Sequence, residues 1–355
     1  MKQFLTAVAA LAVLSILSVG CSRPSDASAE GPMSVIFETD MGNDVDDALA
    51  LDMLYKYMDE GRINLLSVMI NKVEFGAAEY ADIARTWYGY PDIPVGIIKE
   101  GPDCSSDAVN YAEAVATLKK EDGTPAFPRT VEDCSTLPLA VDLYREILAA
   151  QPDESVTIVS TGFSTNLARL LDTPADEVSP LTGKELVAQK VKRLVIMAGV
   201  VSNAEAPEYN VAKDVPSAQK VAAEWPTELI TSPFEIGVNV CYPGQSIAED
   251  FTWADYYPMV EGYKAYLPMP YDRPTWDLTA VLYAVEGIKG DNDASYFNVV
   301  GPGKLEFTDQ AFTRFTPDPE NDRYYLEADS LQMANILGRF KELLVRKPAV
   351  VASQE

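Results

Sequence analysis

The chain has 355 residues, with 28 lysines and arginines against 54 aspartates and glutamates, a formal net charge of −26, and no histidine. We expect no nucleic-acid partner, because a surface this acidic repels nucleic-acid phosphates. The lack of histidine excludes Ser-His-Asp and Cys-His catalysis. It also directs metal binding to oxygen ligands, which suit Ca²⁺ or Mg²⁺.

Residues 1–20 have the features of a signal peptide, with Lys2, a short apolar run and small residues before Cys21. The stretch Leu-Ser-Val-Gly-Cys resembles a bacterial lipobox, in which the cysteine becomes the lipidated first residue of the mature protein. Residues 21–32 are small and polar, as in a tether. We expect an exported protein, periplasm-facing or on the cell surface, held to a membrane only by a lipid on Cys21. Cleavage by ordinary signal peptidase is the alternative.

Three further cysteines follow the expected tether, at Cys104, Cys134 and Cys241. In an oxidising compartment, Cys104 and Cys134 can pair across a polar segment. The sequence leaves open whether this disulfide forms.

From residue 33 onward, the spacing of apolar residues predicts strands that alternate with helices. Strands are expected over residues 34–40, 63–70, 94–98, 155–160, 191–199 and 228–232, with β-hairpins over 295–328. Helices are expected over residues 46–60, 76–90, about 107–120, 139–150, 164–172, 214–225, 275–287 and 330–346. The pattern predicts a single-domain α/β fold over 33–346, with a doubly wound, mostly parallel sheet and a disordered tail over 347–355.

Polar segments fall at the ends of the expected strands. They are Asp40, Asn71, residues 160–165 and residues 199–210. Because ligands bind at the carboxyl ends of the strands in doubly wound sheets, we expect one site that gathers these segments.

The densest group of acids follows the first strand, where Asp40, Asp44, Asp46 and Asp47 lie within eight residues. Gly42 allows a tight turn between strand and helix. Carboxylates this close repel one another unless a cation offsets their charge or some of them face water. Capping of the helix explains Asp46 and Asp47. It does not explain Asp40 at the end of a buried strand, so a hard cation is the preferred interpretation.

This acidic segment resembles the D-x-D-P-G-x-D-D-A-x-A-L signature of the inosine-uridine-preferring nucleoside hydrolase family. Glu38 stands for the first Asp, and two extra residues separate Gly42 from the paired acids. Further segments resemble the family in the same order over about residues 33–290. They are S-V-M-I-N at 67–71, S-T-G-F-S-T-N-L-A at 160–168, I-M-A-G at 196–199 with P-E-Y-N at 207–210, D-V-P-S-A-Q-K-V at 214–221, and R-P-T-W-D-L-T-A-V-L at 273–282.

The resemblance implies calcium-dependent hydrolysis of the N-glycosidic bond of ribonucleosides, giving ribose and a nucleobase. It implies that Asp40 takes the proton of the attacking water and that Ca²⁺ is bound by Asp40, Asp47, Asp277 and the main-chain carbonyl of Thr165. The residues implied to contact the substrate are Asp46, Asn71, Asn203, Glu208 and Asn210. Relatives tend to form dimers and tetramers, so a homo-oligomer is also compatible with it.

Trp276 stands where many relatives have the histidine that helps to protonate the leaving base. This departure favours purine over pyrimidine nucleosides, with Trp276 able to stack on a purine. It leaves Tyr271, Tyr242 and Tyr209 as candidate proton donors. Two other functions remain open: a lipoprotein that binds a sugar or nucleoside with calcium but cleaves nothing, and a hydrolase of another riboside.

Overall fold

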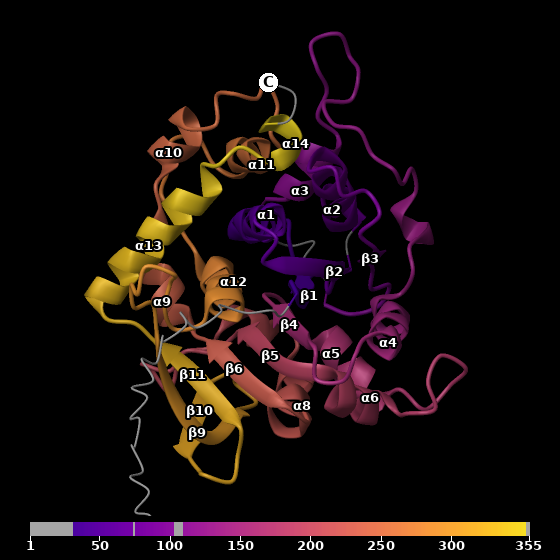
Figure 1. Ribbon diagram of the computed structural model, residues 1–355, viewed down its shortest axis with the longest axis vertical. Coiled ribbons are helices and arrows are strands. Elements are labelled where there is room, and N and C mark those ends of the chain that lie inside the picture. The colour runs from indigo at the N-terminus through magenta and orange to yellow at the C-terminus, as the bar shows by residue number, and fades with distance from the viewer. Residues whose placement is uncertain (1–30, 74, 103–108, 353–355) are drawn as a thin grey trace, which may run out of the picture. The chain divides into compact units, whose positions relative to one another are not determined.

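The computed structural model describes residues 31–73, 75–102 and 109–352 (Figure 1). The expected signal peptide, Cys21, most of the expected tether and Cys104 lie outside these residues. The lipid anchor and the disulfide between Cys104 and Cys134 therefore stay predictions. Residues from Pro32 onward form one compact unit.

The main sheet has nine strands within the described residues, in the order β10-β9-β11-β6-β5-β4-β1-β2-β3. All neighbours from β11 to β3 pair in parallel, and β9 and β10 extend that edge in antiparallel fashion. The strands are β1 (Met33–Thr39), β2 (Ile63–Ile70), β3 (Val95–Gly96), β4 (Val156–Ser160), β5 (Val191–Met197), β6 (Glu228–Ser232), β9 (Asn298–Phe307), β10 (Thr313–Pro317) and β11 (Arg323–Glu327). A separate pair joins β7 (Cys241–Tyr242) to β8 (Arg273–Pro274).

Helices cover both faces of this sheet (Figure 1). On one face lie α1 (Asp46–Asp59), α2 (Phe75–Trp87), α3 (Tyr111–Ala116), α11 (Pro258–Tyr266), α12 (Trp276–Glu286) and α13 (Ser330–Leu344). On the other lie α4 (Ala140–Ala150), α5 (Thr165–Asp172), α6 (Gly183–Lys190) and α8 (Val215–Glu224). The short helices are η1 (Cys134–Thr136), α7 (Tyr209–Lys213), α9 (Phe234–Asn239), α10 (Gly244–Glu249) and α14 (Ala349–Ala352).

Alternating residues of each strand supply the two cores. In β1, Val35 and Phe37 face the core shared with α1 and α12, whereas Ile36 faces the core shared with α4 and α5. All three side chains are fully buried, which is why the strand reads as a continuous apolar run. None of the helices among the described residues has the length and apolar character that crossing a membrane requires.

The predicted α/β fold with its mostly parallel sheet is confirmed. Two local predictions differ from the structure. The expected strand over 94–98 shortens to β3, and α11 lies in a segment with no predicted helix. The expected β-hairpins over 295–328 form as β9, β10 and β11, and they join the main sheet because β11 also pairs in parallel with β6. Within the expected tail over 347–355, residues Ala349–Ala352 form α14, and the N–H of Ala349 donates to the carboxylate of Asp59 at 2.8 Å. Residues 353–355 lie outside the described residues.

The order of the strands locates the ligand-binding edge. The chain runs outward from β1 through β2 to β3, then returns to β4 on the other side of β1 and continues to β5 and β6. Ligands bind at the carboxyl ends of the strands where the order reverses, which is here between β1 and β4. Asp40 directly follows β1, and Thr161 directly follows β4.

Candidate active site

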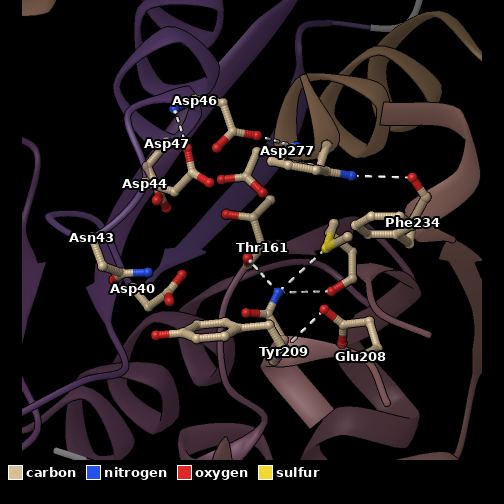
Figure 2. Close-up of a pocket in the computed structure, with 13 residues that line it drawn as sticks. Asp40, Asn43, Asp44, Asp46, Asp47, Thr161, Glu208, Tyr209, Phe234 and Asp277 are labelled. Atoms are coloured by element: carbon tan, nitrogen blue, oxygen red, sulfur yellow. Dashed lines mark hydrogen bonds between the residues drawn. The ribbon is translucent and has the colours of Figure 1, made fainter. Parts of the chain in front are cut away.

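A pocket of about 440 Å³ opens at the carboxyl ends of β1, β4 and β5 (Figure 2). Its walls come from the loop after β1 and from the first turns of α1, α7, α9 and α12. The residues that line it are Asp40, Asn43, Asp44, Asp46, Asp47, Thr161, Met197, Glu208, Tyr209, Asn210, Phe234, Trp276 and Asp277.

Asp46, Asp47 and Asp277 point toward one another at one end of the pocket (Figure 2). Each offers a carboxylate oxygen, these oxygens lie within 4.8 Å of one another, and all three side chains are buried. The hydroxyl of Thr39 donates to Asp47, and the N–H of Asp277 donates to Asp46 at 3.1 Å. Buried oxygens that converge in this way have the arrangement that a metal ion requires.

Burial raises the pKa of each carboxyl in this group, because a low-dielectric environment disfavours the charged form. It raises the pKa of Asp40 to about 7. Burial first, and then repulsion from neighbouring carboxylates, raises the pKa of Asp46, Asp47 and Asp277 well above the usual value for aspartate. Deprotonation of all four therefore needs a compensating cation.

The loop between β1 and α1 holds Asp40 and Asp44 in different surroundings. Gly42 has a φ of 126°, which suits glycine, and its carbonyl accepts the N–H of Tyr111 at 3.0 Å. Asp44 forms a two-pronged ion pair with Arg273, with Nε to Oδ1 at 2.9 Å. The charge of Asp44 is thus balanced by Arg273, whereas Asp46 and Asp47 belong to the buried group with Asp277.

Glu208 and Asn210 form the wall opposite the three carboxylates. The Glu208 carboxylate accepts the N–H groups of Asn210 and Val211, both at 3.0 Å, and so caps α7. The side-chain amide of Asn210 donates to the carbonyls of Thr161 at 3.0 Å and Met197 at 3.1 Å. These bonds tie the ends of β4 and β5 to α7 and leave two polar side chains directed to the pocket.

The structure changes the assignment of the threonine carbonyl. Thr165 is not among the residues that line the pocket, and its hydroxyl donates to Asp214 at 2.5 Å. Thr165 is the first residue of α5, whereas Thr161 directly follows β4 and lines the pocket. The earlier of the two threonines in the Ser-Thr-Gly-Phe-Ser-Thr segment is therefore the candidate ligand.

Two expected sugar contacts also lie outside the pocket lining. Asn71 is fully buried behind it, where its amide would lie 2.6 Å from a Cβ placed at Gly162. Asn203 is exposed, and its side chain accepts the N–H of Glu205 at 3.1 Å in a turn. Both asparagines follow a strand, but Asn71 is fully buried and Asn203 lies in an exposed turn between β5 and α7.

Of the four aromatic residues expected near the site, two line the pocket and two do not. Trp276 lines the pocket, where its ring stacks on Phe234 at 5.4 Å between centroids and its Nε1 donates to the Phe234 carbonyl at 3.1 Å. Tyr209 also lines it. Tyr242 and Tyr271 do not, because their hydroxyls bond Ser246 and the Tyr263 carbonyl respectively.

Sequence reasoning missed several residues of the site. Phe234 lies outside the recognised segments, whereas Met197 and Asn43 lie within them but were not singled out as pocket residues. Arg273 lies in the Arg-Pro-Thr-Trp-Asp segment, where a basic residue near a predicted acidic site was a usable signal. Its ion pair with Asp44 explains how this part of the acidic group is neutralised.

A profile of the family described as inosine-uridine preferring nucleoside hydrolase matches residues 35–312. Comparison with curated protein sequences gave no match. The plant nucleoside hydrolase PpNRh1 superposes with a TM-score of 0.62 at 17% identity, over 89% of this chain and 100% of that chain. The purine-preferring ribonucleoside hydrolase of Gardnerella vaginalis gives a TM-score of 0.62 at 15% identity, over 88% of this chain and 99% of the other.

The inosine-uridine preferring nucleoside hydrolase of Bacillus anthracis gives a TM-score of 0.61 at 18% identity, again over 88% of this chain and 99% of the other. At these identities the superpositions establish the fold. The family profile goes further, since it covers most of the chain from β1 through β9. The chain therefore belongs to the inosine-uridine preferring nucleoside hydrolase family and is an N-glycosyl hydrolase of nucleosides.

Proposed function

We propose that this enzyme uses Ca²⁺ to hydrolyse the N-glycosidic bond of ribonucleosides to ribose and nucleobase, and that it prefers purine nucleosides. The observation that carries the proposal is the convergence of Asp46, Asp47 and Asp277 within 4.8 Å in a pocket that Asp40 also lines. The three converging side chains offer carboxylate oxygens, and Ca²⁺ prefers oxygen ligands.

Asp40, Asp47, Asp277 and the Thr161 carbonyl would hold the ion, with Thr161 replacing Thr165. When bound, Ca²⁺ supplies a fixed positive charge that acidifies water and attracts hydroxyl oxygens. Asp40 accepts the proton of the water that attacks the anomeric carbon, since its carboxylate lines the pocket beside the converging acids and a bound cation would keep it deprotonated.

The sugar fits between the two polar walls of the pocket. Asp46 accepts a hydrogen bond from a ribose hydroxyl on one side, and Glu208 and Asn210 bind hydroxyls on the other. Hydrogen bonds to sugar hydroxyls that strengthen as the ring becomes oxocarbenium-like lower the barrier to cleavage.

The base lies against the aromatic wall made by Trp276, Phe234 and Tyr209. A purine offers more ring area than a pyrimidine for stacking, which supports the proposed preference. A structural neighbour from Gardnerella vaginalis is described as purine-preferring, in agreement with it. We assign Tyr209 as the donor to the leaving base, because it is the candidate tyrosine that lines the pocket.

The proposal includes export and attachment to a bacterial membrane through a lipid on Cys21. Mass spectrometry of the protein purified from cells should find a diacylglyceryl group on Cys21, and Cys21→Ala should release the protein from the membrane fraction. An unmodified N-terminus after residue 21 would support ordinary cleavage instead.

The test of activity is ribose release by the purified protein from a panel of purine and pyrimidine nucleosides, with and without a calcium chelator. We expect chelator-sensitive release that is fastest for purines. Asp40→Asn should abolish turnover and only weaken nucleoside binding measured by calorimetry. Calcium and nucleoside binding without any ribose release would identify a binding protein, and release from another riboside alone would change the substrate class.

A further inference from the structure

Lys72 is a buried lysine beside the acidic group that the mechanism above does not use. It follows Asn71 at the end of β2, and only 2% of its surface is exposed. Its ammonium donates a hydrogen bond of 3.2 Å to Oδ1 of Asn43. A buried ammonium is costly unless nearby groups compensate it, so its place next to a cation site calls for an explanation.

Asn43 connects Lys72 to Asp40. The Asn43 side chain lies beside the Asp40 carboxylate in the lining of the pocket. The charge of Lys72 and the neighbouring Asn43 amide lower the pKa of Asp40 against the larger effect of burial. Figure 2 shows Asn43 and Asp40 side by side at one end of the pocket. Asn43 thus lies between Asp40 and Lys72, and its Oδ1 accepts the hydrogen bond from the Lys72 ammonium.

The loop that carries Asn43 is fixed at three points. Gly42 accepts the N–H of Tyr111, Asn43 accepts from Lys72, and Asp44 pairs with Arg273. This loop contains the two residues by which the chain exceeds the spacing of the family signature. The longer loop is therefore attached, on the side of Asp40, to the buried ammonium of Lys72.

We propose that Lys72, acting through Asn43, is a positioning residue that orients Asp40 for proton transfer and limits the calcium affinity of the site. This inference rests on the proposed function. Asn43, held in place by its hydrogen bond from Lys72, limits the orientations open to the neighbouring Asp40 carboxylate, which aids catalysis. The positive charge of Lys72 repels a second cation bound nearby, which weakens calcium binding. Replacing Lys72 should therefore lower turnover but raise calcium affinity. Replacing a lysine that only supports the fold would lower both turnover and calcium affinity.

The experiment compares Lys72→Met, Lys72→Arg and Asn43→Ala with the unaltered protein. Calcium affinity is measured by titration calorimetry, and kcat and KM are measured for a purine nucleoside. Lys72→Met should bind calcium on the order of tenfold more tightly and have a lower kcat with little change in KM. Lys72→Arg should return calcium affinity close to the original value. Asn43→Ala should lower kcat without tighter calcium binding, because the charge remains.

Lys56→Met is the matched control, since Lys56 is equally buried on α1 and its ammonium donates to the Arg346 carbonyl. It should leave calcium affinity unchanged. Unchanged or weaker calcium binding by Lys72→Met would overturn the inference. An unchanged kcat in Asn43→Ala would also overturn it, and this second variant tests the inference even if Lys72→Met fails to fold. An unaltered protein that releases no ribose contradicts the proposed function instead, and the two failures are therefore distinct.

Discussion

The backbone N–H of Asp277 donates a 3.1 Å hydrogen bond to the carboxylate of Asp46, 231 residues earlier in the chain. Asp46 begins α1 and Asp277 lies in the first turn of α12, so this bond joins the N-termini of two packed helices. Partial positive charge at helix N-termini favours carboxylates there. The carboxylates of the site are therefore held by rigid elements and not by a mobile loop.

Asp46 and Asp47 are adjacent, but their replacement should have different effects. Asp47→Asn should lower calcium affinity by about 100-fold or more, because it removes a proposed ligand. Asp46→Asn removes a charge beside the ion but keeps an oxygen that accepts the N–H of Asp277, so calcium affinity should fall much less than in Asp47→Asn. It should raise KM by roughly 10- to 100-fold, since a hydrogen bond to a charged group contributes about 1.5–3 kcal/mol. Calorimetry with calcium and steady-state kinetics separate the two, and equal losses of calcium affinity would refute the division of roles.

Asn210 and Asn203 lie in the same segment after β5 and provide a direct comparison. Asn210→Ala removes donors to the Thr161 and Met197 carbonyls, and it should raise KM by about tenfold or more. Asn203→Ala removes only an exposed turn contact to Glu205 and should leave kcat and KM unchanged. A rise of KM in Asn203→Ala would restore the expected sugar contact that the structure does not support.

Close packing behind Trp276 provides a third prediction. A Cβ at Gly237 would lie 2.4 Å from the Trp276 Cα, so Gly237→Ala must displace the aromatic wall. We expect kcat/KM for purine nucleosides to fall by roughly 2- to 10-fold, the size of a lost stacking contact, with a smaller change for uridine.

Gly338→Ala is the matched control, because Gly338 also lies in a helix but has open space around it. It should keep full activity and gain about 0.5–1 kcal/mol of stability from higher helix propensity. An equal loss of activity toward purines and uridine in Gly237→Ala would show that Trp276 does not contact the base.

Local patterns predicted what depends on local physics. The apolar run of β1, the paired acids that begin α1 and the alternation of strands and helices each reflect burial or capping by nearby residues. The position of Asp40 at the end of a buried strand was enough to place the site. Asp277 was assigned through family resemblance, and the structure brings it to the same point.

Side-chain direction could not be predicted in the same way. Asn71 and Asp40 both follow parallel strands, yet one points into the core and the other into the pocket. The motif led to Thr165, which begins α5, whereas Thr161, four residues earlier, is the threonine that lines the pocket. The ion pair between Asp44 and Arg273 joins segments 229 residues apart and follows from the tertiary fold.

Asp52, on α1, should make stability depend on pH away from the metal site. Its carboxylate accepts the hydroxyls of Tyr88 and Tyr257, and burial raises its pKa to about 6 although the charge of Lys56 lowers it. Between about pH 4 and pH 6, the folded state binds a proton that the unfolded state has released, given an unfolded pKa of about 3.9. Stability from this group is therefore full below about pH 4 and is lost as the pH rises to about 6.

The loss should amount to about 3 kcal/mol by pH 7, taking about 1.4 kcal/mol for each unit of pKa. Asp52→Asn keeps an acceptor for Tyr88 and Tyr257 but does not titrate. Urea unfolding of both proteins at pH 4, 5, 6 and 7 in excess calcium measures the effect, because other groups cancel in the difference. The variant should gain stability relative to the unaltered protein as the pH rises. A difference that stays constant across this range would show that Asp52 titrates as an ordinary exposed aspartate.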